Sequence, residues 1–125
     1  IGKMNLFEGR VCGAGNGSVQ IDVNGLERIA VPFAGSASGS VGIAVRPEKV
    51  LVTRDEPDGG RIRIRGRVRE VAYYGDESHI FVENPTGVVI NATLPNDRRS
   101  TTPAVALGDE LWLSWTPADT LVLTE

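Results

Sequence analysis

The glycine-rich run from Gly13 to Ser18 is the stretch of this chain whose composition most suggests phosphate chemistry. A phosphate-binding loop needs backbone N–H groups that surround the phosphates, a lysine beside them and a helix that begins immediately afterwards. This run contains no lysine, and Val19 to Val23 after it alternates between apolar and polar side chains as a strand does. Asn16-Gly17 is typical of a tight hairpin turn. We therefore predict a β-hairpin here, and no enzymatic hydrolysis of nucleotides by this part of the chain.

Arginines recur at every second position from Arg61 to Arg69, so a strand would carry all five on one face. Such a face could bind successive phosphates of a nucleic acid. That mode also needs exposed aromatic rings for base stacking, whereas the chain has two Trp, two Tyr, three Phe and a net charge of −3. We favour the alternative, in which the arginines pair with acidic side chains of neighbouring strands.

Thiol and metal chemistry have little support in the composition. Cys12 is the single cysteine and His79 the single histidine, so an intrachain disulfide is excluded and a structural zinc set is not available. We expect Cys12 to be a small, half-buried residue. The sequence therefore predicts no metal and no cofactor within these 125 residues.

Fifteen glycines and seven prolines divide the chain into short segments that alternate with a period of two residues. The strands expected in the first half are 7–12, 18–23, 27–32, 41–45 and 50–52, with a single helical turn at 47–49. Those expected in the second half are 61–69, 78–83, 88–94, 110–115 and 121–123, with an exposed loop at 96–105. This pattern predicts an all-β fold whose short antiparallel strands close into small barrels, because closure removes unpaired edges.

Two details of the later strands can be predicted. The alternation changes parity at Arg69 and Glu70, which indicates a β-bulge there. Trp112 and Trp115 would point to opposite faces of their strand. Trp115 shares a face with two leucines and is expected in the core, which leaves Trp112 as the exposed member and a candidate association surface.

Four motifs, in this order, resemble the C-terminal region of the ATP-binding subunits of ABC importers. They are Asn5-Leu6-Phe7-Glu8-Gly9-Arg10-Val11, Val45-Arg46-Pro47-Glu48-Lys49-Val50, Tyr73-Tyr74-Gly75-Asp76 and Leu111-Trp112-Leu113-Ser114-Trp115-Thr116-Pro117-Ala118-Asp119. Polyamine, iron and sugar importers carry similar motifs in a regulatory segment often called TOBE, and the first two are most similar to the polyamine and iron(III) branch. The chain departs from the pattern at Tyr74, where leucine is common.

The resemblance implies OB-like small barrels of the TOBE type, formed by two interleaved β-units of short antiparallel strands. It implies a single regulatory β-domain over 1–125, with possible sub-units at about 1–57 and 58–125. Ile1 in place of an initiator methionine is expected for a piece of a longer protein. ATP and magnesium would then bind an ATPase domain outside this sequence.

The function implied is that of a non-catalytic regulatory and dimerisation domain of a bacterial ABC importer, for polyamines of the spermidine/putrescine type or a related small solute. Its partners would be a second copy and the transporter's membrane subunits, at the cytoplasmic face of the inner membrane. Arg46 and Glu48 are interface candidates, although a plain turn explains them equally well. Trp112 is a candidate dimer contact, and Tyr73 with Tyr74 a possible pocket for a small effector. The alternative function is a free-standing OB-type module that binds nucleic acid.

Overall fold

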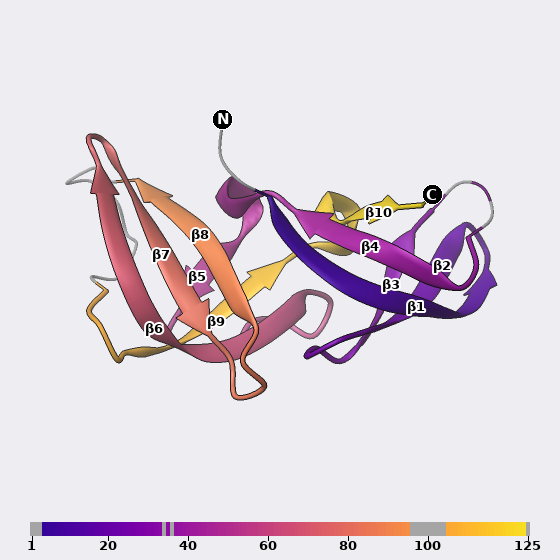
Figure 1. Ribbon diagram of the computed structural model, residues 1–125, viewed down its shortest axis with the longest axis horizontal. Coiled ribbons are helices and arrows are strands. Elements are labelled where there is room, and N and C mark those ends of the chain that lie inside the picture. Colours follow the sequence, from indigo (N-terminus) through magenta and orange to yellow (C-terminus); the bar gives the residue numbers. More distant parts are fainter. Residues whose placement is uncertain (1–3, 34, 36, 96–104, 125) are drawn as a thin grey trace.

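In the part of the chain that the structure describes, the regular elements are β-strands and two single helical turns (Figure 1). The computed structural model describes residues 4–33, 35, 37–95 and 105–124. In these residues the strands are β1 (Asn5–Gly15), β2 (Ser18–Val23), β3 (Arg28–Pro32), β4 (Ser40–Val45), β5 (Leu51–Thr53), β6 (Ile62–Tyr74), β7 (Glu77–Glu83), β8 (Val89–Pro95), β9 (Glu110–Trp115) and β10 (Leu121–Leu123). The 3-10 turns are η1 (Pro47–Lys49) and η2 (Pro117–Asp119). The predicted all-β fold is confirmed.

The strands form two five-stranded antiparallel sheets that lie side by side (Figure 1). Sheet 1 has the order β10-β4-β1-β2-β3, and sheet 2 has the order β5-β9-β6-β7-β8. The last strand of the chain therefore completes the sheet that contains the first strand. Likewise β5 leaves β4 and pairs with β9 in sheet 2. Each half of the chain thus supplies one strand to the sheet of the other half.

The two halves follow one plan. Strands β1, β2, β3 and β4 occupy the same positions in sheet 1 as β6, β7, β8 and β9 occupy in sheet 2. The fifth strand of each sheet comes from the other half of the chain, β10 in sheet 1 and β5 in sheet 2, and these two are called the exchanged strands. The connections β4–η1–β5 and β9–η2–β10 have identical lengths, and each 3-10 turn begins with a proline, Pro47 or Pro117. We conclude that the chain contains an internal structural repeat, which was not predicted from its sequence.

The first strands of the two halves are also alike. The register of β1 shifts between Val11 and Gly13, and that of β6 shifts at the equivalent place, between Val68 and Glu70. The predicted bulge near Arg69 and Glu70 is therefore confirmed. A bulge adds bend and twist to a long strand, which lets each sheet curl around its own apolar face.

Inward-pointing side chains from both sheets form a single hydrophobic cluster. Trp115 is fully buried in it and stacks on Phe7 of β1, with ring centroids 6.2 Å apart. Its indole nitrogen donates a hydrogen bond to the hydroxyl of Thr120 at 3.1 Å. The predicted core position of Trp115 is confirmed. Most of the loop predicted at 96–105 lies outside the described residues, because only Val105 of that range is described.

Candidate functional site

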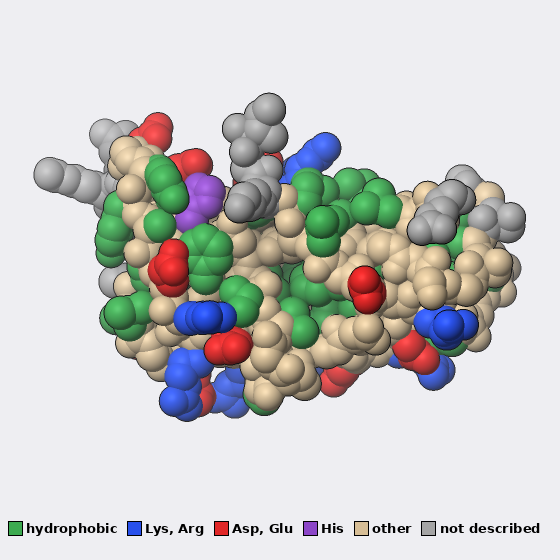
Figure 2. All heavy atoms as spheres, in the orientation of Figure 1, with side chains coloured by type: hydrophobic (Ala, Val, Ile, Leu, Met, Phe, Trp, Pro, Cys, Tyr) green, Lys and Arg blue, Asp and Glu red, His purple; other side chains and the backbone are tan. Residues whose placement is uncertain are grey.

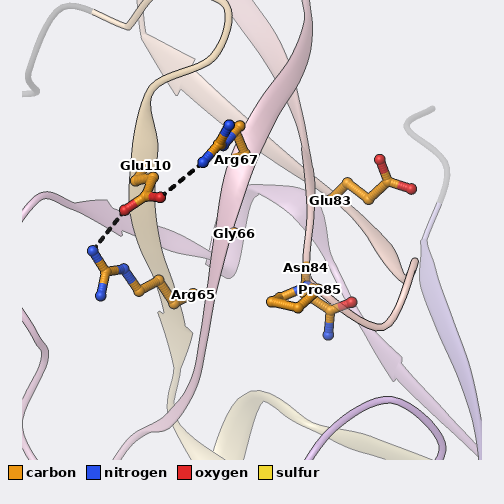
Figure 3. Close-up of a pocket in the computed structure, with 7 residues that line it drawn as sticks. All are labelled: Arg65, Gly66, Arg67, Glu83, Asn84, Pro85 and Glu110. Carbon is orange, nitrogen blue, oxygen red and sulfur yellow. Dashed lines mark hydrogen bonds and ion pairs between the residues drawn. The ribbon is translucent and has the colours of Figure 1, made fainter.

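The arginine face of β6 borders an open cleft of about 490 Å³ (Figure 3). Glu110 of β9 lies between two guanidinium groups, as Figure 3 shows, while Asn84 and Pro85 lie on the other side of the strand. Arg65 Nη2 donates to Glu110 Oε2 at 2.7 Å, and Arg67 Nη2 donates to Oε1 at 3.1 Å. The hydrogen bond from Arg67, together with the charges of Arg65 and Arg67, holds the pKa of Glu110 below its usual range. This carboxylate therefore stays ionised to a lower pH than an unpaired glutamate and partly neutralises both arginines.

The arginines nearer the start of β6 are bonded within the chain as well. Arg63 forms an ion pair with Glu56 at 3.3 Å and donates to the carbonyl oxygen of Pro57 at 2.8 Å. Arg61 donates to the hydroxyl and the carbonyl oxygen of Ser114 at 2.9 and 3.2 Å. The predicted pairing with acidic side chains of a neighbouring strand is thus confirmed for Arg65 and Arg67, whose partner Glu110 lies in β9, whereas the acidic partner of Arg63 lies in the loop before β6. Such a face is typical of a solvated strand.

Trp112 is half-buried, so it is less exposed than expected. The guanidinium carbon of Arg65 lies 5.9 Å from the centre of its ring, within the range of a cation–π contact. Trp112 also borders a second cleft of about 570 Å³, between β6 and the turns at Gly25 and Thr86. The dimer contact assigned to Trp112 stays a prediction.

Tyr73 and Tyr74 lie at the end of the β6–β7 hairpin, and 73% and 61% of their surfaces are exposed. The ring of Tyr74 contacts the ring of His79 edge to face, with centroids 4.9 Å apart. His79 in turn lies 3.2 Å from a carboxylate oxygen of Glu77. The two tyrosines precede Gly75, whose φ of 63° suits a tight turn. Their role in an effector pocket stays a prediction.

Arg46 and Glu48 flank Pro47 at the start of η1 and are exposed, whereas Pro47 is buried. The turn predicted at this motif is therefore present. Among the described residues, neither charged side chain has a hydrogen bond or an ion pair. The interface role assigned to both residues stays a prediction.

Asn84 is a structural residue that sequence reasoning missed. Its Nδ2 donates to the carbonyl oxygen of Gly25 at 2.7 Å, and this hydrogen bond joins the two halves of the chain. Its Oδ1 accepts from the backbone N–H groups of Thr86 and Val88 at 3.0 and 2.9 Å. An asparagine that precedes Pro-Thr-Gly is typical of such side-chain turns, and that signal could have identified it.

Cys12 is exposed, so the expectation of a half-buried side chain is wrong. It lies on β1 at the bulge between Val11 and Gly13, where it has no partner residue in the register with β2. Within the described part of the chain, no group of three or more His, Cys, Asp or Glu side chains is placed to hold a metal ion. The described residues also form no helix that is long and apolar enough to cross a bilayer.

Comparison with known proteins agrees with the features of this fold. A family model described as "TOBE domain" matches residues 43–123. A spermidine/putrescine import ATP-binding protein, PotA, of Thermobifida fusca is 35% identical over 98% of this chain and 32% of its own length. The putrescine transport ATP-binding protein PotG of Escherichia coli is 32% identical over 99% of this chain and 34% of its own length. The chain therefore spans about a third of the length of these relatives.

A solved structure gives independent support for the fold. The cytoplasmic molybdate-binding protein ModG superposes with a TM-score of 0.78, covering 97% of this chain and 96% of its own. Its sequence identity is 15%, so this likeness concerns the fold alone. With two OB-like sheets, the motif order of β1, η1 and β9, and a family match over most of its length, this chain belongs to the TOBE domain family.

Proposed function

We propose that this chain is the non-catalytic regulatory and dimerisation domain of the ATP-binding subunit of a bacterial ABC importer for spermidine, putrescine or a related small solute. The observation that supports this most is the likeness, over 98% of the chain, to a relative named as a spermidine/putrescine import ATP-binding protein. The relative is about three times longer, so the transport activity belongs to the proposal and rests on parts outside this sequence.

The mechanism we propose is mechanical. Two copies of the domain hold two ATPase domains near each other while those domains separate and close, because linked modules re-associate at a high effective concentration. An effector or partner that prefers one arrangement shifts the balance between the open and closed forms. The shared core and exchanged strands support this role, since the two halves cannot move apart without breaking strand pairs.

The chemistry of the transport cycle lies elsewhere in this proposal. ATP and magnesium bind the ATPase domain, and the present chain contributes no catalytic group and no cofactor. The domain works at the cytoplasmic face of the inner membrane as a peripheral part, in contact with the transporter's membrane subunits. A small effector at Tyr73 and Tyr74 would act through the β6–β7 hairpin, on which both side chains are exposed.

The first test is to read the native coding sequence upstream of residue 1. A Gly-rich phosphate loop ending in Lys and Ser or Thr is expected there. The second test compares the intact subunit with a version that lacks residues 1–125, in membranes that contain the whole transporter. Nucleotide binding should persist in the shortened subunit, whereas spermidine uptake and its control should be reduced. An upstream sequence without the phosphate loop would contradict the proposal.

A further inference from the structure

The outer face of sheet 1 carries a patch of exposed leucines over β10, β4 and β1. Leu6 of β1 and Leu121 of β10 flank Ala44 of β4 in one cross-strand row. Leu123 lies beside Gly42 in the next row, and a Cβ atom placed on Gly42 would be 3.4 Å from the Cβ atom of Leu123. The exposed fractions of Leu6, Leu121 and Leu123 are 66%, 41% and 49%. Figure 2 shows hydrophobic side chains gathered over this part of the molecule.

The internal repeat shows that the fold does not require apolar side chains on this face. In sheet 2 the row equivalent to Leu6, Ala44 and Leu121 consists of Arg63, Ser114 and Leu51. Both rows contain an exposed leucine, Leu121 or Leu51, but the other two members differ: Arg63 and Ser114 are polar and bonded within the chain, whereas Leu6 is apolar and 66% exposed beside Ala44. Folding of this kind of sheet therefore does not require the patch, and an exposed apolar patch indicates association.

Charged side chains lie on either side of this row in a self-complementary arrangement. Arg46 follows Ala44 by two positions in extended backbone, so it lies one step beyond the row on the same face. Glu8 follows Leu6 by two positions and pairs with Gly42. It therefore lies next to the row Leu6–Ala44–Leu121, on the opposite side of that row from Arg46. Among the described residues, neither side chain has an ion pair. Neither charge is therefore neutralised by a described residue.

We infer that this leucine face is the surface through which two copies of the chain associate, with a two-fold axis along the row Leu6–Ala44–Leu121. Rotation about that axis places like residues of the row opposite each other, and brings Arg46 of each copy to the level of Glu8 of the other. One interface then contains an apolar centre with two ion pairs at its rim. The inference rests on the proposed function, for which it names the dimerisation surface.

A charge-exchange experiment tests this geometry. Arg46→Glu places two negative charges opposite each other in both rim contacts, and Glu8→Arg places two positive charges there. Each variant alone should self-associate about tenfold more weakly than the native chain, as measured by sedimentation equilibrium at low salt. An equimolar mixture of the two variants should regain the native affinity, because both rim contacts of the mixed dimer then join opposite charges. Arg69→Glu, at an exposed arginine of sheet 2, is the matched control and should change nothing.

Cross-linking tests the position of the axis without relying on affinity. In a Cys12→Ser background, Leu6→Cys should give a covalent dimer with a short bis-maleimide, because the two Leu6 positions face each other. Tyr73→Cys in the same background should not. A chain that stays monomeric at every concentration would overturn the inference. Dimers whose affinity does not respond to the charge changes and that fail to cross-link at Leu6 would overturn the inference too. Such dimers would form through another face, so the proposed function would remain intact.

Discussion

The side chain of Asn5 is paired with the backbone of Asn91 in the manner of a neighbouring strand. Asn5 Nδ2 donates to the carbonyl oxygen of Asn91, and the backbone N–H of Asn91 donates to Asn5 Oδ1, both at 2.8 Å. Asn91 lies in β8, at the edge of sheet 2, whereas Asn5 begins β1 in sheet 1. Asn5 is the first residue of the Asn-x-Phe-x-Gly motif, so this motif residue joins the two sheets.

Asn5→Ala is expected to destabilise the chain by roughly 2 to 4 kcal/mol, because it leaves a backbone donor and a backbone acceptor of Asn91 without their partner. Asn5 is 6% exposed, so water replaces the lost bonds poorly. Urea unfolding followed by tryptophan fluorescence measures the change. Gln20→Ala, at an exposed position on β2, is the control and should cost less than about 0.5 kcal/mol. Equal effects of the two changes would contradict the role assigned to Asn5.

Gly9→Ala should destabilise the chain by about 1 to 3 kcal/mol through overpacking. A Cβ atom at Gly9 would lie 2.6 Å from Ile21 Cγ2 and 3.0 Å from the carbonyl oxygen of Asp22, so β2 has to shift. Gly59→Ala offers a matched control, since an added Cβ atom there meets nothing within 4 Å. Thermal unfolding measures the stability of both variants. A Gly9→Ala protein as stable as the Gly59→Ala protein would show that β2 shifts without loss of stability.

The separate fragments 1–57 and 58–125 are expected to remain unfolded, whereas the intact chain should unfold in one transition. The first fragment lacks β10, which covers the edge of β4, and it contains β5 without its partner β9. Circular dichroism of each fragment, alone and mixed, makes the comparison. Mixing should restore strand structure, because each fragment then supplies the other's missing strand. A fragment that folds alone would show that the halves are independent sub-units.

The ion pairs of Glu110 predict a pH dependence of stability. Because the folded-state pKa of Glu110 is lowered, its pairs with Arg65 and Arg67 stabilise the fold above the ordinary glutamate pKa, and this contribution is lost as the pH falls through the lowered value. Glu110→Gln should therefore be less stable than the native chain at neutral pH and equal to it in strong acid.

Chemical unfolding at several pH values measures this difference. Glu70→Gln changes an exposed glutamate for which no ion pair occurs among the described residues, and it should follow the native profile throughout. A constant gap between Glu110→Gln and the native chain at every pH would mean that packing of the side chain, and not its charge, accounts for the effect.

The strands of this fold are largely predictable because their signal is local. Alternation located β2, β9 and β10 at their observed bounds, and the loss of parity at Arg69 and Glu70 located the bulge in β6. Trp115 was assigned to the core from its neighbours on the same face. Each of these features depends on residues that lie close together in the sequence.

The remaining features depend on contacts between distant residues. The pairing of β10 with β4 joins residues nearly eighty positions apart, and alternation does not reveal which strands are partners. The repeat was missed because equivalent positions such as Leu6 and Arg63 differ in character. The function of Asn5 was missed for a similar reason, since its partner Asn91 is remote in sequence.

The exchange of β5 and β10 bears on how force passes through the molecule. Each sheet holds a strand that is covalently continuous with the opposite sheet, by way of η1 or η2. A torque applied to one sheet therefore also loads the ladders β5–β9 and β10–β4, in each of which three residue pairs join the exchanged strand to its partner. For the role in an importer subunit proposed above, this continuity means that a displacement of one sheet is passed on to the other.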